Sequence, residues 1–290
     1  MTTSRMLSRC TDRKLRLLCL HGMYQDAITF MAKTKHLHGI NSNEHPNMTA
    51  SRMLSRCTDR KLRLLCLHGM YQDAITFMAK TKHLHGINSN VELIFLDGPF
   101  ITVPPILARQ SKRPSTVSSK MKHIHSSKKK KMEFRAWWRL PGIHQKDSSS
   151  LDGDRDVLIN FLREKLDEIG DVDGVVGFSQ GASLAAWMCS EQACAELHWS
   201  PKLAVLFGSY LSSPQFSLDS GVVPDISSLH VFGLNDYVIP AAKSQQVMDI
   251  FQETLDNRVL TSVHAKGHVV PKCDAFKQLF ESFLTLQNIR

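Results

Sequence analysis

The chain has 290 residues, of which 42% are hydrophobic and 22% charged, a composition typical of a globular protein with a sizeable core. No apolar run reaches the roughly 20 residues that a membrane-spanning helix needs, so we expect no membrane span. The net charge is +9, but residues 109–146 alone hold twelve Lys or Arg against one acid. The basic charge therefore belongs to one segment, which excludes a uniformly basic fold.

The N-terminal part contains a tandem repeat. Residues 1–43 and 48–90 match at every position except Thr3, whose counterpart is Ala50. Each copy holds one apolar strand and a His-Gly turn, and a sheet has only one place for this strand. The second copy runs directly into another predicted strand at residues 91–97, so we expect it to form the first strand and residues 1–47 to be an extra, poorly ordered segment. The alternative is that the first copy enters the sheet and displaces the second.

Strands and helices alternate through the rest of the chain. Paired prolines, Ser/Thr clusters and a run of four lysines predict a flexible basic insert at about residues 104–133. Beyond it, we expect a helix at 157–169, a strand and helix around 173–186, strands at 202–208 and 229–233, a helix at 241–253, a strand at 258–264 and a helix at 273–287. This alternation predicts that residues 48–290 form an α/β domain with a mainly parallel sheet of about six strands and helices on both faces.

The central motif is Gly-Phe-Ser-Gln-Gly at residues 177–181, between an apolar strand and a helix of small residues. This G-x-S-x-G pattern is typical of a nucleophile elbow, a tight turn that exposes a serine hydroxyl above the sheet edge. Ser179 is therefore the candidate nucleophile. The Gln180 N–H lies at a helix N-terminus and is a candidate donor to an oxyanion, with the Met70 N–H after the first strand as the second donor.

A serine nucleophile needs a base and an orienting carboxylate, in the chain order Ser, Asp, His for this type of fold. Asp236 follows a predicted strand by one loop, and His268 follows the last predicted strand. Either residue alone would be read as an ordinary loop residue. Because the carboxyl ends of parallel strands share one edge, we expect Ser179, Asp236 and His268 to form a catalytic triad there.

Several motifs resemble the FSH family of small serine hydrolases, relatives of the ovarian tumour suppressor candidate hydrolase and of fungal polyketide-releasing esterases. They are Leu-Cys-Leu-His-Gly-x-x-Gln, Leu-Ile-Phe-Leu-Asp-Gly-Pro, Arg-Ala-Trp-Trp, Gly-Phe-Ser-Gln-Gly-Ala, Gly-x-x-Asp-x-x-Ile-Pro and Gly-His-x-x-Pro. The resemblance runs from about Lys61 to the C-terminus. It implies an α/β-hydrolase without a large cap domain and with carboxylesterase or thioesterase activity. The duplicated strand and the basic loop depart from the family pattern.

We therefore expect an acyl-enzyme mechanism on a small-molecule acyl ester or thioester, with no cofactor and no metal. The acyl pocket is predicted at Tyr71, Trp137, Trp138 and Leu211, with core packing as the alternative for the two tryptophans, which we expect to dock on the domain. Seven cysteines without metal-ligand spacing indicate buried, reduced thiols. This pattern favours a cytoplasmic protein, with the nucleus as the alternative compartment.

Two other functions remain as alternatives. One is a non-catalytic protein that contacts acidic partners through the Lys128–Lys131 run, since lysine runs attract polyanions. A solvated loop is the preferred interpretation of this run, and we do not expect nucleic acid as a partner. The other is an inactive scaffold, in which the duplicated N-terminus disturbs the sheet.

Overall fold

The computed structural model describes residues 60–104, 133–140, 150–212 and 214–287. All of them fall within the unit Leu54–Arg290. The predictions for residues 1–47 and for nearly all of the basic insert at 104–133 lie outside the described residues.

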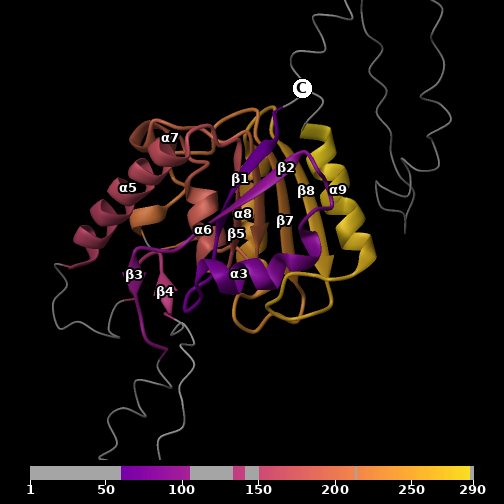
Figure 1. Cartoon of the computed structure of the whole chain (residues 1–290), viewed down its shortest axis with the longest axis horizontal. Coiled ribbons are helices and arrows are strands. Elements are labelled where there is room, and N and C mark those ends of the chain that lie inside the picture. The colour runs from indigo at the N-terminus through magenta and orange to yellow at the C-terminus, as the bar shows by residue number, and fades with distance from the viewer. Residues whose placement is uncertain (1–59, 105–132, 141–149, 213, 288–290) are drawn as a thin grey trace, which may run out of the picture. The chain divides into compact units, whose positions relative to one another are not determined.

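The described residues form a six-stranded parallel sheet in the order β2-β1-β5-β6-β7-β8 (Figure 1). The strands are β1 (Leu62–Leu67), β2 (Val91–Leu96), β5 (Gly174–Phe178), β6 (Leu203–Phe207), β7 (Ser227–Gly233) and β8 (Arg258–His264). Strand β1 comes from the second copy of the repeat and pairs with both β2 and β5. The prediction of a parallel sheet of about six strands is confirmed, and the carboxyl ends of all six strands lie at one edge.

Helices cover both faces of this sheet, as predicted (Figure 1). Helices α3 (Ala74–Thr81) and α9 (Asp274–Gln287) contribute Phe77, Phe280 and Phe283 to the core on one face. Helices α5 (Ser150–Ile169), α6 (Gln180–Trp187), α7 (Glu191–Leu197) and α8 (Ala241–Glu253) pack on the other. Two short 3₁₀ helices, η2 (Lys82–Leu84) and η3 (Pro214–Phe216), complete the helical elements of the described chain.

The strand sequences explain why both faces need cover. Successive side chains of a strand point to opposite faces, so in β1 Leu64 and Cys66 join the core beneath α3 and α9 while Leu65 and Leu67 join the other core. A strand buried on both faces must be apolar at nearly every position, which is the pattern that β1, β5 and β6 show. Edge strand β2 is only half-buried.

A two-stranded antiparallel ribbon lies outside the main sheet. It pairs β3 (Phe100–Ile101) with β4 (Arg135–Ala136), and the Thr102 N–H donates to the Phe134 carbonyl just beyond it, over 2.8 Å. The ribbon leads directly to Trp137 and Trp138, which are 0% and 5% exposed. The prediction that these tryptophans dock on the domain is confirmed, because both rings belong to the core on the α5 face.

The four described cysteines are free thiols. Cys66 and Cys189 are buried, Cys194 is half-buried and Cys273 is exposed. The prediction of buried cysteines is therefore confirmed for two of the four described residues. Burial raises the pKa of the Cys66 and Cys189 thiols far above the ordinary value, which keeps them protonated and unreactive. Within the described part of the chain, no helix is both long and apolar enough to cross a bilayer.

Candidate active site

Ser179 lies at the turn between β5 and α6. Its backbone has φ 57° and ψ −119°, a strained conformation for a residue with a side chain. A Cβ added to Gly177 would lie 2.2 Å from the Gly181 carbonyl oxygen, and one added to Gly181 would lie 2.2 Å from the Leu67 carbonyl oxygen. The two glycines therefore let helix α6 approach the ends of β5 and β1, as the elbow requires.

Asp236 and His268 meet beyond the ends of β7 and β8. Asp236 Oδ1 accepts hydrogen bonds from the backbone N–H groups of Val238 (2.9 Å) and Ile239 (2.8 Å), and its Oδ2 lies 2.6 Å from His268 Nδ1. Because a carboxylate only accepts, Nδ1 carries a proton, and in the neutral imidazole Nε2 then holds the lone pair. His268 Nε2 is buried and has no hydrogen-bond partner among the described residues.

The histidine lies beside the serine turn. The ring of Phe178, the residue before Ser179, is 4.7 Å from the His268 ring between centroids. Gly208 follows β6 with φ +61°, and a Cβ built there would approach His268 Cε1 to 3.0 Å. One built on Gly69 would come within 3.3 Å of the Ser179 Cβ. The Asp236–His268 pair therefore lies beside the turn that carries Ser179, and among the described residues no hydrogen bond joins Ser179 Oγ to His268 Nε2.

The two candidate oxyanion donors are held by their peptide units. In a trans peptide, N–H and C=O point in opposite directions, so fixing the carbonyl fixes the direction of the N–H. The Gly69 carbonyl, which shares a peptide with the Met70 N–H, accepts from His68 Nδ1 (2.8 Å) and from the Gln72 N–H (3.2 Å). The Ser179 carbonyl, which shares a peptide with the Gln180 N–H, accepts from the N–H groups of Ala182 and Ser183.

Neither candidate donor, the N–H of Met70 or that of Gln180, is used by a hydrogen bond within the described part of the chain. His68 is fully buried, and its Nε2 accepts from the Gly98 N–H over 2.9 Å, which places the proton on Nδ1. Burial lowers the pKa of His68, which favours this neutral form. A neutral histidine thus keeps the Gly69–Met70 peptide in place.

The residues assigned to the acyl pocket separate into two groups. Trp137 and Trp138 are buried, and the Trp137 Nε1–H donates to the His68 carbonyl over 2.7 Å. Their burial favours core packing over a role as pocket walls. Tyr71 is half-buried with φ 60° and donates its N–H to the Arg135 carbonyl, and Leu211 is 42% exposed on the loop after β6.

Sequence reasoning missed the polar side chains that hold the tryptophan segment. The buried Gln180 amide accepts from the Trp137 N–H (3.0 Å) and donates to the Trp138 carbonyl (2.9 Å). Asp154, which is buried on α5, accepts from Arg139 Nε over 2.9 Å. The sequence contains both a glutamine in the elbow motif and an Ala-Trp-Trp motif, but their presence in one chain does not by itself predict that they are in contact.

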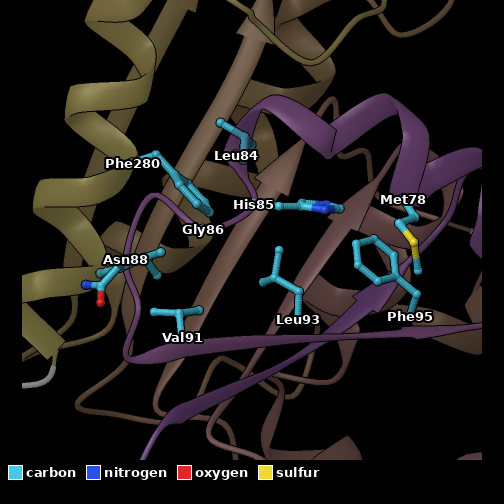
Figure 2. A pocket seen from close by; sticks show the side chains of 10 residues that line it. Met78, Leu84, His85, Gly86, Asn88, Val91, Leu93, Phe95 and Phe280 are labelled. Carbon is cyan, nitrogen blue, oxygen red and sulfur yellow. The ribbon is translucent and has the colours of Figure 1, made fainter.

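A separate cavity of about 230 Å³ lies at the β2 edge of the sheet, between β2, α3–η2 and α9 (Figure 2). Apolar side chains such as Leu93, Phe95 and Phe280 line most of it. None of the predicted triad residues lines this cavity, so it is distinct from the candidate site. Among the described residues, no group of three or more His, Cys, Asp or Glu could hold a metal ion.

Two solved structures with a similar fold are those of a carboxylesterase and an acyl-protein thioesterase. The chain resembles a Bacillus cereus carboxylesterase with a TM-score of 0.51 at 15% identity, covering 79% of this chain and 89% of that one. It resembles acyl-protein thioesterase 2 of Zea mays with a TM-score of 0.50 at 17% identity, covering 78% and 94%. At this identity the likeness shows the fold alone, and that fold is the α/β-hydrolase.

The family follows from the sequence itself. Residues 57–280 match the family described as Serine hydrolase (FSH1), and the chain belongs to this family. It is 31% identical to Esterase OVCA2 of Danio rerio over 159 residues, which cover 52% of this chain and 67% of that protein. It is 28% identical to Esterase C25G4.2 of Caenorhabditis elegans over 172 residues, which cover 57% and 73%. The resemblance to FSH hydrolases is thereby confirmed, and the chain is a serine hydrolase.

The match to these relatives is partial. The alignment with Esterase OVCA2 of Mus musculus, at 32% identity, covers 43% of this chain and 54% of that protein. The chain thus matches between about half and three quarters of the length of these three relatives.

Proposed function

We propose that this protein hydrolyses carboxylic esters or thioesters through an acyl-enzyme on Ser179, with His268 as base and Asp236 as the orienting acid. The observation that carries the proposal is the 2.6 Å contact between Asp236 Oδ2 and His268 Nδ1. It fixes the tautomer of a histidine whose Nε2 has no other described partner and whose ring packs against the residue before Ser179.

The reaction proceeds in two halves. Ser179 Oγ attacks the acyl carbonyl while its proton passes to His268 Nε2, and the Asp236 carboxylate stabilises the imidazolium that forms. The carbonyl oxygen becomes an oxyanion, which the N–H groups of Met70 and Gln180 stabilise. The tetrahedral intermediate collapses, and His268 gives its proton to the departing alcohol or thiol. Water, activated by the same histidine, then attacks the acyl-enzyme, releases the acid and restores the serine.

The test is the Ser179→Ala variant. We expect kcat for p-nitrophenyl acyl esters to fall at least about 10⁴-fold, because the hydroxyl is the only group that can carry the acyl chain. A fluorophosphonate probe should label the wild-type protein and not the variant. Ser220→Ala is the control and should retain both activity and labelling, because it removes an exposed hydroxyl that, among the described residues, accepts from the Gln192 N–H. Equal turnover by wild type and Ser179→Ala would refute the mechanism.

The choice between ester and thioester follows from a comparison of substrates. The same acyl group presented as an oxygen ester and as a thioester gives two kcat/KM values, whose ratio expresses the preference as differential stabilisation of the transition state. An acyl-length series on the better leaving group then measures the depth of the acyl pocket. A ratio near one would mean that the site recognises the acyl group alone.

A further inference from the structure

Three apolar side chains in the loop after β7 are exposed to solvent. Leu234 and Val238 are each 65% exposed, and Tyr237 is 93% exposed. The loop also carries Asp236, the proposed acid, which is buried at its centre. A single exposed apolar side chain is ordinary, but a group of them on one loop beside a catalytic site indicates an interaction surface.

The backbone of this loop is fixed by bonds that do not involve the apolar side chains. The Leu234 N–H donates to the His264 carbonyl (2.8 Å), and the Asn235 side chain donates to the Ala265 carbonyl (2.7 Å). Asp236 binds the N–H groups of Val238 and Ile239. Polar side chains at positions 234, 237 and 238 would leave all of these bonds in place. The fold therefore explains the shape of the loop, but not why its exposed side chains are apolar.

The loop after β8 extends the same surface. Gly233 pairs with His264, and the Asn235 N–H donates to the Lys266 carbonyl, so the two loops lie together at the carboxyl edge of the sheet (Figure 1). This second loop contributes Val269, which is 42% exposed. The rim patch is defined here as Leu234, Tyr237, Val238 and Val269.

On the two loops that carry the rim patch, the unpaired charges among the described residues are positive. Lys266 and Lys272, on the β8 loop, are exposed and form no ion pair among the described residues. Of the carboxylates on the two loops and the start of α9, Asp236 is buried against His268 and Asp274 pairs with Lys277. The surface thus combines apolar side chains with unpaired cations, which suits an anionic lipid better than a neutral or cationic one.

We propose that the rim patch docks the protein onto an anionic phospholipid surface and brings the catalytic edge of the sheet to esters held in that surface. Tyrosine prefers the headgroup level, leucine and valine enter the boundary with the acyl chains, and lysine is attracted to anionic headgroups. The delivery of substrate rests on the proposed function. The docking itself does not.

The test is co-sedimentation of the full chain with vesicles of phosphatidylcholine and phosphatidylserine at roughly 7:3. The double variant Tyr237→Ser with Val238→Ser should lower the partition coefficient about tenfold, because it removes the two side chains that enter the boundary. The control is Leu255→Ser, which removes an 84% exposed leucine just before β8, at the opposite edge of the sheet, and should bind as wild type does. An unchanged thermal midpoint shows that each variant is folded.

The charge contribution is tested separately. Lys266→Gln should weaken binding to the mixed vesicles about fivefold and leave binding to pure phosphatidylcholine unchanged, since one lysine near an anionic surface contributes about 1 kcal/mol. Lys61→Gln is the matched control and should have no effect, because it removes an exposed lysine just before β1, at the opposite edge, that forms no ion pair among the described residues.

Two results would overturn the docking proposal. One is absence of binding by the wild type, and the other is a folded double variant that binds as tightly as the wild type, which would assign binding to another part such as the basic segment 109–146. Ser179→Ala should bind vesicles as the wild type does. Vesicle binding therefore tests the docking proposal, and turnover of p-nitrophenyl esters tests the proposed hydrolysis, so a failure of one can be distinguished from a failure of the other.

Discussion

At the scale of single residues, the two ring nitrogens of His68 act on different peptides. Nδ1–H donates to the Gly69 carbonyl, whose peptide carries the Met70 N–H, and Nε2 accepts from the Gly98 N–H. We infer that His68 positions the oxyanion donor without touching the substrate. The sequence predicted that the His-Gly pair ends a strand, but it did not predict that the histidine positions the oxyanion donor.

His68→Ala should lower kcat about tenfold with little change in KM. Removing an oxyanion donor costs about 10²–10³ in rate, and a donor that is present but badly aimed should cost less. His68→Asn should recover part of kcat, because its amide nitrogen can occupy the place of Nδ1. Steady-state kinetics on a soluble ester measures both variants. A folded alanine variant with wild-type kcat would mean that the histidine has no positioning role.

At the scale of elements, the approach of α6 to β1 and β5 depends on glycine. Gly181→Ala should lower the free energy of unfolding by about 3 kcal/mol, because its Cβ would meet the Leu67 carbonyl at 2.2 Å and the helix would have to move. Gly153→Ala is the control: it lies within α5, its Cβ would meet nothing within 4 Å, and it should stabilise the fold by about 0.5–1 kcal/mol. Urea unfolding measures both, and similar effects would refute the steric explanation.

The elements also show what a sequence can predict. Strands such as β5 and β6 could be predicted because a strand buried on both faces is a continuous apolar run, and the elbow because its glycines have a steric cause. The β3–β4 ribbon could not be predicted, since each strand has two residues and so no periodicity. Nor could the contacts of the Gln180 and Asp154 side chains, which join segments that only the tertiary fold brings together.

At the scale of the whole molecule, the histidines make stability depend on pH. Burial lowers the pKa of five described histidines, and that of His230, which is packed against Phe251, falls to about 3; the other four are His68, His83, His85 and His264. Below the ordinary pKa of about 6.5, the unfolded chain binds protons that the folded chain does not. Stability should therefore fall as the pH drops below about 6.5 and continue to fall towards the folded pKa values.

Between pH 7 and pH 5, His230 alone should account for a loss of about 2 kcal/mol in the free energy of unfolding. Urea titrations at the two pH values measure the loss. His230→Gln should reduce it by about this amount. His83→Gln, which replaces a half-buried histidine, should reduce it less. An equal pH dependence for wild type and His230→Gln would show that folding does not lower the pKa of this histidine.

Gly208 is a position at which a substitution would affect the proposed catalytic histidine and leave the residues of the hydrophobic core unchanged. It lies after β6, between the strands that carry the serine and the acid–base pair, and its missing side chain leaves room for the imidazole. An alanine at this position would place its Cβ 3.0 Å from the His268 ring and strain the backbone at φ +61°, while both hydrophobic layers kept their residues. One added methyl group would therefore act first on the proposed base, since the buried side chains of both faces come from other positions.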